Sequence, residues 1–148
     1  MTMWMPEVKT TTTPGDQFLA GVLGVEADIE AAKRIEAGFP AGVVERFLKA
    51  APDARDSLND VLKMSPRTLT RRRGEGRLSP AESDRLYRVV ALYALAADVL
   101  GSVEAADEWM TSPAVALNDA APLDYSRNAA GAKRVERLLL RLEHGVYS

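Results

Sequence analysis

The amino-acid sequence predicts an all-α protein, and three observations carry that prediction. No segment shows the sustained alternation of apolar and polar residues that a half-buried strand requires. Apolar residues instead recur at intervals of three and four, which places them on one face of a helix. Two pairs, Ser65-Pro66 and Ser79-Pro80, mark helix starts, with Ser as the N-cap and Pro at the first helical position. The 148 residues suffice for one compact domain, or for two small helical lobes that share a core.

The first half of the chain is expected to form short helices after an N-terminal tail. Residues 1–15, with the run Thr10–Thr13, show no periodicity and are expected to be mobile. Four helices should follow. The first is capped by Asp16 and ends at Gly24, and the second is capped by Asp28, runs through Ala37 and closes at Gly38. The third is opened by Pro40, with Val43, Val44, Phe47 and Leu48 on one face, and the fourth is started by Asp53, with Leu58, Val61 and Leu62 on one face.

A short helix should begin at Ser65 and stop at Gly74-Glu75-Gly76, and the longest helix should run from Ser79 to near Gly101. Ser79 and Glu82 match a capping box at its start. Its apolar residues form two neighbouring stripes: Tyr87, Val90, Ala94 and Ala97 in one, and Leu86, Val89, Tyr93 and Leu100 in the other. Because this face is broader than a surface helix needs, we expect a central helix that joins two lobes.

The C-terminal part should contain two further helices and short turns. Ser102 is expected to cap a helix through Met110, Pro113 and Pro122 mark turns, and Asn128 should cap the last helix, with Val135, Leu138, Leu139 and Leu142 on its apolar face. The predicted organisation is therefore a tail at 1–15, an N-terminal domain at 16–78, and a central helix with a C-terminal domain at 79–148.

Composition excludes several classes of function. The chain has no Cys and one His, which excludes disulfide scaffolds, thiolate zinc sites, cysteine nucleophiles and multi-histidine metal sites. No apolar run approaches the ~20 residues of a membrane span, and the start does not match a secretory signal, so we expect a cytoplasmic protein. No phosphate-binding loop is present, His144 is near the terminus, and Asp107 and Glu108 are adjacent on a helix and point apart. We therefore expect neither an enzyme nor a cofactor.

Charge is distributed unevenly along the chain. Residues 1–40 carry 3 basic and 6 acidic side chains, residues 41–90 carry 11 and 7, and residues 91–148 carry 5 and 8. Six acidic residues and no basic one lie between Asp98 and Asp124. A basic centre between acidic flanks indicates two surfaces for different partners.

The basic centre coincides with a candidate helix-turn-helix at residues 54–73. Two short helices are joined there by a tight connection at Lys63-Met64. Leu69 should face the core together with Leu62 and Met64. Lys63 occupies a position where such turns often have Gly with positive φ, and Asn59 one usually given to a small residue.

The second helix of such a motif presents its N-terminal residues to DNA bases in the major groove. Arg67 and Arg71 are four residues apart, as are Thr68 and Arg72, so these four side chains should project outward in two adjacent rows. Arginine suits guanine and phosphate alike. The candidate DNA contacts are Ser65, Arg67, Thr68, Arg71 and Arg72. A solvated basic face is the alternative interpretation.

The chain ends with an apolar-aromatic segment, Gly145-Val146-Tyr147, directly after a predicted helix. A frayed end is the commonest interpretation of such a segment. A short apolar tail on a rigid helix also suits the cleft of a partner protein.

The order of these motifs resembles the Xre/MbcA/ParS antitoxins that are paired with RES-domain toxins. The resemblance covers about two-thirds of the chain, and it rests on these segments: Ser65 to Arg72, Arg77 to Leu86, Glu104 to Met110, Pro113, Ala116-Leu117, Pro122 to Asp124, Gly131-Ala132, Val135 and Glu143 to Tyr147. The sequence departs from the family pattern at Asn118-Asp119, where Gly-Gly is usual, at Tyr125-Ser126, where Leu-Leu is usual, and at Asn128, which replaces Thr.

The resemblance implies an N-terminal helix-turn-helix part and a C-terminal toxin-binding part in a homodimer that forms a higher hetero-oligomer with its toxin. RES toxins attack NAD⁺, and the C-terminal end of such an antitoxin typically blocks the toxin's active-site cleft. The implied toxin contacts are Glu143, His144, Gly145, Val146, Tyr147 and Ser148. The resemblance also implies binding to operator DNA and repression of the antitoxin's own gene.

Two alternatives remain open from sequence alone. A stand-alone transcription regulator would use the same helix-turn-helix, with the C-terminal lobe as a dimerisation unit. A protein-interaction adaptor would have lost DNA binding, a possibility that Lys63 and Asn59 leave open. A toxic protein encoded by an adjacent reading frame would distinguish an antitoxin from a regulator.

Overall fold

The computed structural model of the protein describes residues 12–25 and 28–145. Within these ranges the secondary structure is helical, apart from two isolated β-bridges that pair Pro40 with Arg77 and Ala114 with Ala120. The predicted all-α class is confirmed. The helical elements are α1 Pro14–Leu23, α2 Asp28–Ala37, α3 Val43–Ala50, the 3₁₀ turn η1 Pro52–Ala54, α4 Arg55–Val61, α5 Pro66–Glu75, α6 Pro80–Leu100, α7 Val103–Met110, the 3₁₀ turn η2 Val115–Leu117, α8 Pro122–Tyr125 and α9 Ala129–Glu143.

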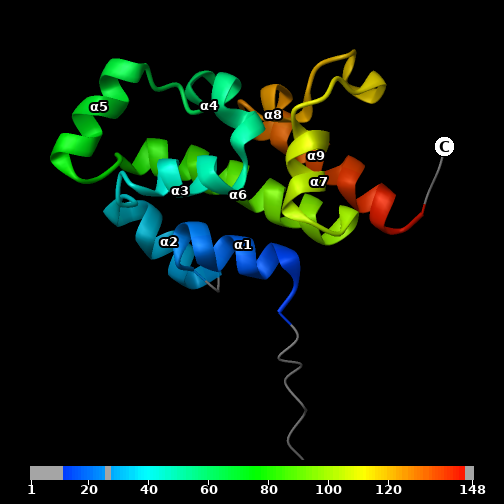
Figure 1. Ribbon diagram of the computed structural model, residues 1–148, viewed down its shortest axis with the longest axis horizontal. Helices are drawn as coiled ribbons and strands as arrows, with labels where there is room; N and C mark the ends of the chain where they lie inside the picture. The colour runs from blue at the N-terminus through cyan, green and yellow to red at the C-terminus, as the bar shows by residue number, and fades with distance from the viewer. Residues whose placement is uncertain (1–11, 26–27, 146–148) are drawn as a thin grey trace, which may run out of the picture.

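Helix α6 is the central element, as the sequence predicts. It runs along the long axis of the molecule and contacts α1, α2, α7 and α9 (Figure 1). The expected capping box is present, because the Ser79 hydroxyl accepts the Glu82 N–H at 3.1 Å and the Glu82 carboxylate accepts the Ser79 N–H at 2.8 Å. Gly101 ends the helix in the left-handed conformation that Gly favours, with φ at 101°. Helix α5 lies at one end of the molecule and α9 leads to the other (Figure 1).

An aromatic cluster joins the N-terminal helices to α6. The Tyr93 ring of α6 meets the Phe47 ring of α3 edge-on, with centroids 5.0 Å apart, and Phe18 of α1 lies 5.9–6.0 Å from both. Buried apolar side chains continue from this cluster to Val135 and Leu139 of α9. The two halves of the chain therefore share one hydrophobic core.

A buried carboxylate, Asp107 of α7, connects three elements. One of its oxygens accepts the Asp53 N–H of η1 at 2.9 Å, and the other accepts the Tyr93 hydroxyl of α6 at 3.0 Å. Burial raises the pKa of Asp107, and the hydrogen bonds from Asp53 and Tyr93 offset this only in part. As the sequence indicates, Asp107 and its neighbour Glu108 point apart, because Asp107 is buried and Glu108 is exposed.

The N-terminal boundary differs from the expected one. Thr13, not Asp16, caps α1: the Thr13 hydroxyl accepts the Asp16 N–H at 3.0 Å, and the Asp16 carboxylate accepts the Thr13 N–H in return. Gly15 is buried against α6, where its N–H donates to Asp98 at 2.7 Å and a Cβ would lie 2.3 Å from the Ala94 oxygen. The expected tail at 1–15 is therefore too long, and residues 1–11 lie outside the described residues.

The start of α3 also differs from the sequence interpretation. Pro40 does not open this helix, which begins at Val43. The preceding residues pair with the segment after α5: the Ala41 N–H donates to the Gly76 oxygen and the Leu78 N–H to the Phe39 oxygen. These backbone hydrogen bonds hold Pro40 in a β-bridge with Arg77, so the helix begins only at Val43.

Smaller differences occur at other helix ends. Helix α2 begins at Asp28 itself, and the turn η1 precedes α4. Leu100 and Leu142, expected on apolar faces, lie at helix ends and are 36% and 40% exposed. No single helix among the described residues has the length and apolar character to cross a membrane; only α6 and α7 together pass that test, as a pair bent by 116°.

Replacing Asp107 by Ala tests whether its carboxylate holds the three elements together. The Asp53 N–H and the Tyr93 hydroxyl would each lose their acceptor, at about 1–3 kcal/mol apiece. Urea denaturation at pH 7 should show this loss. Asp107→Asn is the matched control, because its amide oxygen can accept one N–H while its NH₂ donates to the Tyr93 oxygen. Equal stability of the Ala and Asn variants would contradict this role.

The raised pKa of Asp107 also fixes the sign of a pH effect. The folded state holds this proton to higher pH than the unfolded state, whose carboxyl ionises near 3.8. The contribution of Asp107 to stability therefore decreases as pH rises from 3.8 through its folded pKa, and Asp107→Asn should lack this decrease.

Candidate functional site

The connection between α4 and α5 has the geometry of a helix-turn-helix. Lys63 adopts φ 54°, the left-handed conformation for which the sequence led us to expect Gly. A side chain in this conformation costs about 1–2 kcal/mol. Backbone bonds hold the turn, because the Met64 N–H donates to the Asn59 oxygen at 2.9 Å. Leu62, Met64 and Leu69 are buried as predicted, so they fix α5 against the core.

Most candidate DNA contacts lie on the accessible side of α5. Ser65 is the N-cap, and its hydroxyl accepts the Thr68 N–H at 3.1 Å and donates to the Thr68 hydroxyl at 3.0 Å. Arg67 is exposed and has no ion pair among the described residues. The Arg71 side chain is 61% exposed, with its Nε 3.6 Å from Glu75. Arg67 and Arg71 are therefore available to a partner, and Thr68 is partly buried beside them.

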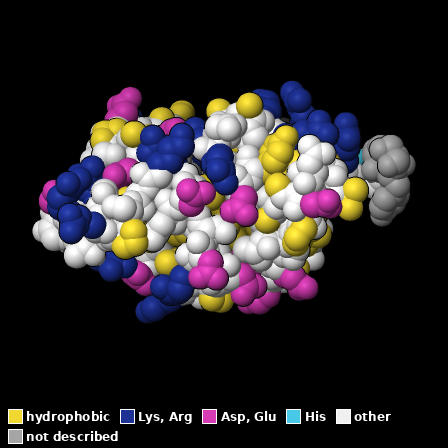
Figure 2. All heavy atoms as spheres, turned by 90° about the horizontal axis from the view of Figure 1, so that it is seen from above, with side chains coloured by type: hydrophobic (Ala, Val, Ile, Leu, Met, Phe, Trp, Pro, Cys, Tyr) yellow, Lys and Arg dark blue, Asp and Glu magenta, His cyan; other side chains and the backbone are white. Residues whose placement is uncertain are grey.

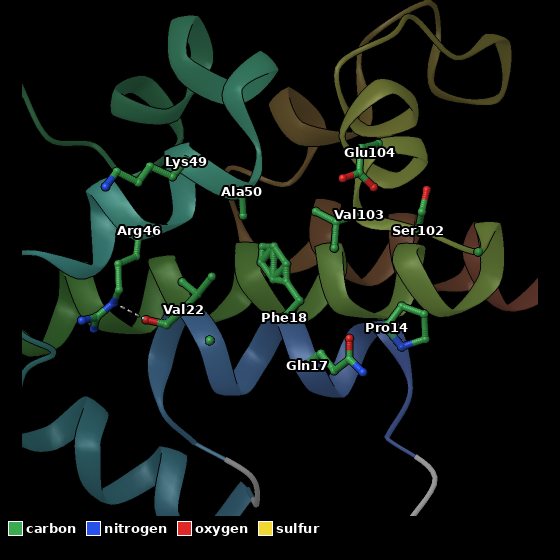
Figure 3. A pocket seen from close by; sticks show the side chains of 12 residues that line it. Pro14, Gln17, Phe18, Val22, Arg46, Lys49, Ala50, Ser102, Val103 and Glu104 are labelled. Atoms are coloured by element: carbon green, nitrogen blue, oxygen red, sulfur yellow. Dashed lines mark hydrogen bonds between the residues drawn. The ribbon is translucent and has the colours of Figure 1, made fainter.

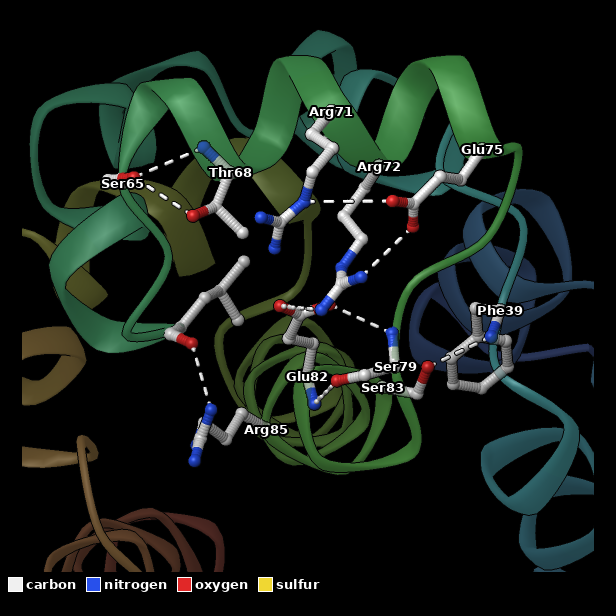
Figure 4. A network of polar contacts seen from close by, with 11 residues as sticks. Phe39, Ser65, Thr68, Arg71, Arg72, Glu75, Ser79, Glu82, Ser83 and Arg85 are labelled. Atoms are coloured by element: carbon white, nitrogen blue, oxygen red, sulfur yellow. Dashed lines mark hydrogen bonds and ion pairs between the residues drawn. The ribbon is translucent and has the colours of Figure 1, made fainter.

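Arg72 does not project outward, contrary to expectation. Its guanidinium turns toward α6, where Nε donates to Glu82 Oε1 at 2.8 Å and Nη2 to Glu82 Oε2 at 3.3 Å (Figure 4). Nη1 also donates to Glu75 at 3.0 Å. The side chain is only 22% exposed. Arg72 therefore joins α5 to α6, and it is a positioning residue in this structure.

The environment of Glu82 makes this contact a charged one. Burial alone would raise the pKa of the Glu82 carboxyl, but the hydrogen bonds from Arg72 and from the Ser79 N–H lower it below its ordinary value of 4.5. The hydrogen bonds to Glu82 and Glu75 likewise raise the pKa of Arg72. The Glu82 carboxylate, which is part of the capping box of α6, thus also anchors α5, the second helix of the helix-turn-helix.

A groove of about 700 Å³ lies between α1, α3 and the start of α7 (Figure 3). Phe18, Val22 and Val103 form an apolar lining, with Arg46 and Lys49 toward one end and Glu104 toward the other. Arg46 is held in place because its Nε donates to the Val22 oxygen at 3.1 Å. The sequence analysis did not predict this groove. Across residues 12–25 and 28–145, no cluster of His, Asp or Glu has the makeup of a metal site.

The C-terminal helix α9 is held firmly at its start and is exposed at its end. Asn128 caps it as predicted, accepting the Gly131 N–H at 2.8 Å. Gly131 packs so closely on α8 that a Cβ would lie 1.8 Å from the Tyr125 oxygen. Of the predicted toxin contacts, Glu143, His144 and Gly145 are exposed at the end of the described chain. Val146, Tyr147 and Ser148 lie outside the described residues.

The C-terminal region is not uniformly acidic. Exposed basic side chains cover part of α9: Lys133, Arg134, Arg137 and Arg141. Figure 2 shows Lys and Arg gathered at the end of the molecule where α5 lies and again toward the opposite end. The acidic character that the sequence indicated for this region belongs to the stretch from Asp98 to Asp124.

The loop between α7 and α8 explains one departure from the family pattern. Asn118 and Asp119 adopt φ 55° and 66°, conformations that Gly enters most easily. Asn and Asp tolerate the left-handed region better than other side chains. The Gly-Gly that is usual at these positions and the Asn-Asp found here therefore serve the same turn.

Replacing Arg72 by Ala tests its positioning role. We expect a lower melting temperature at pH 7, whereas Arg71→Ala, one residue away on the exposed side, should leave it nearly unchanged. Because the folded pKa of Glu82 is depressed, the contribution of the ion pair is present above pH 4.5 and is lost as pH falls through the folded pKa. Equal melting temperatures for the two variants at pH 7 would contradict this role.

Both the helix-turn-helix part and the C-terminal part of the chain match known protein families. Residues 30–91 match the family described as "Antitoxin Xre-like helix-turn-helix domain", and residues 95–145 match "Antitoxin Xre/MbcA/ParS C-terminal toxin-binding domain". The two matches meet inside α6 and not at residue 79. This is a family of antitoxins, and it is not enzymatic.

Three curated relatives carry the name antitoxin Xre. The one from Yersinia enterocolitica serotype O:8 is 34% identical over 116 residues, covering 77% of this chain and 78% of the relative. The one from Photorhabdus laumondii is 27% identical, covering 75% and 76%, and the one from Pseudomonas putida KT2440 is 28% identical, covering 87% and 80%. With matches to both domains and this extent of similarity, the chain belongs to the Xre/MbcA/ParS antitoxin family.

Proposed function

We propose that this antitoxin neutralises a RES-domain, NAD-consuming toxin by blocking the toxin's active-site cleft with its C-terminal end, and that α5 binds operator DNA for autoregulation. The active species would be a cytoplasmic homodimer that forms a larger complex with the toxin. The observation that carries the proposal is the separation of two exposed surfaces, α5 and the end of α9, toward opposite ends of one core (Figure 1).

The support for a blocking end comes from the way α9 is held. Val135 and Leu139 are fully buried, and the first turn packs directly on α8. The helix ends at Glu143 with exposed residues after it. A segment delivered from a fixed helix loses less conformational entropy on binding than one from a free chain. Blocking a cleft in this way requires no catalytic group from the antitoxin.

The support for DNA binding comes from the helix-turn-helix and its exposed arginines. Ser65 starts α5, and Arg67 and Arg71 are accessible on its first two turns. In a homodimer two such helices would read half-sites about one helical turn, ~34 Å, or a multiple of it apart. Arg72 would contribute indirectly, by holding α5 on α6.

Deleting residues 145–148 tests the blocking end. The melting temperature should stay unchanged, because Val135 and Leu139, which are fully buried, hold α9 on the core. Neutralisation should be lost, and the readouts are growth and NAD⁺ level in cells that express the product of the adjacent reading frame.

In the same cells the full chain should restore growth and NAD⁺, and Arg67→Ala should do so as well, because it changes only the opposite end. Normal neutralisation by the truncated chain would reject the blocking model. A neighbouring product that is harmless would instead favour the stand-alone regulator.

Replacing Arg67 and Arg71 by Ala tests the DNA surface. Each phosphate contact contributes about 0.9 to the slope of log affinity against log salt concentration. We expect each lost contact to weaken binding to the DNA upstream of the gene and to reduce that slope by about this amount. Arg134→Ala, an exposed arginine on α9, is the matched control and should leave the slope unchanged. Equal slopes for the Arg67→Ala, Arg71→Ala and Arg134→Ala variants would argue against DNA binding by α5.

A further inference from the structure

The turn between α7 and α8 presents an apolar side chain to solvent. Val115 is 87% exposed, more than any other large hydrophobic side chain among the described residues. Two residues later, Leu117 is buried at 1% exposure. The turn therefore has one side chain anchored in the core and one directed away from it.

Backbone contacts give this turn a defined shape. The Ala114 N–H donates to the Ala120 oxygen at 3.1 Å, and the Asp119 N–H donates to the Ala114 oxygen at 3.0 Å. Asn118 and Asp119 both adopt left-handed conformations to close the turn. These hydrogen bonds fix the backbone on both sides of Val115. The turn would therefore lose little conformational entropy when a partner covers the Val115 side chain.

A hollow borders the base of the same turn. It has a volume of about 470 Å³, and its lining includes Ala120 of the turn, Tyr125 of α8 and Gly131 of α9. Tyr125 is itself 36% exposed. An exposed apolar tip beside a hollow with a part-exposed aromatic ring is typical of the centre of a protein interface.

The surroundings of this surface indicate the chemistry of its partner. Asp119 lies on the turn and Asp124 lines the hollow, both in the acidic stretch from Asp98 to Asp124. Arg127, the basic residue in the lining, pairs with Asp60 of α4 at 3.4 Å. The turn, the hollow and the end of α9 all lie in the segment that matches the toxin-binding domain, and the turn and the end of α9 project from the end of the molecule opposite α5 (Figure 1).

We propose that Val115 and the adjoining hollow form a second toxin-binding surface, in addition to the C-terminal end, and that Val115 inserts into an apolar recess of the toxin bordered by Lys or Arg. This inference rests on the proposed antitoxin function. The Val115 turn and the end of α9 are two separate contacts on one rigid core. While one contact is made, it keeps the other close to the toxin, so the toxin dissociates more slowly.

Val115→Asp in the full chain tests this surface. Titration calorimetry with the purified product of the adjacent reading frame should show affinity reduced at least tenfold, and Val115→Ala should show a smaller loss. Ile29→Asp is the matched control, because Ile29 is 77% exposed on α2 in the N-terminal part. It should bind as the wild type does. Melting temperatures and DNA affinity should be unchanged in all three variants.

Equal toxin affinity for Val115→Asp and the wild type would overturn the inference while leaving the antitoxin function intact. Loss of self-association in Val115→Asp, with unchanged toxin affinity per protomer, would overturn it as well and assign the surface to a second copy of this chain. Failure of the wild type to bind the toxin would overturn both the inference and the proposed function.

Discussion

The burial of α6 is the constraint on which the rest of the structure depends. This helix spans 21 residues, and its buried side chains include Leu86, Leu92 and Tyr93. Such a helix is unstable in water unless other elements cover it on several sides. The N-terminal helices α1 and α2 provide part of the cover, and α7 and α9 provide the rest. Neither half of the chain can bury α6 completely without the other.

Carboxylates at the edge of this core fix how the surrounding elements are placed. Asp98 accepts the Gly15 N–H of α1, Glu82 holds Arg72 of α5, and Asp107 joins η1 to α6 and α7. Two of these groups lie on α6 itself. The same helix therefore supplies apolar area for burial and specific acceptors for orientation, and each acceptor is directed at a different element.

Local rules predicted much of this fold from sequence. Caps at Ser65, Ser79, Ser102 and Asn128 were correct, because each satisfies backbone donors within its own helix. Lys63 counted as a departure from the motif in the sequence, because Gly is usual at that position, yet it adopts the left-handed conformation there. Thr13 was missed because Thr13 and Asp16 are both good caps, and only the close packing of Gly15 on α6 shows which one begins the helix.

Tertiary contacts decided what local rules could not. Arg71 and Arg72 are identical in type and adjacent, and only the position of Glu82 turns one inward and leaves the other exposed. Asp107 resembles an ordinary surface acid in sequence, and one of its two hydrogen-bond donors is the N–H of Asp53, which is 54 residues away. The net charge of residues 91–148 is negative and concealed the exposed basic residues of α9. The charge count adds these residues to the acidic ones between Asp98 and Asp124, although they lie on a different element of the fold.

Two partner surfaces on one core are the central claim of this account, and sedimentation velocity with labelled DNA from upstream of the gene tests it most directly. The DNA is first saturated with the antitoxin, and the product of the adjacent reading frame is then added. If α5 and the α9 end serve different partners, a ternary complex should sediment faster than the antitoxin–DNA complex. Complete release of the DNA on toxin binding would contradict the claim, because it would mean that the two partners compete for one surface.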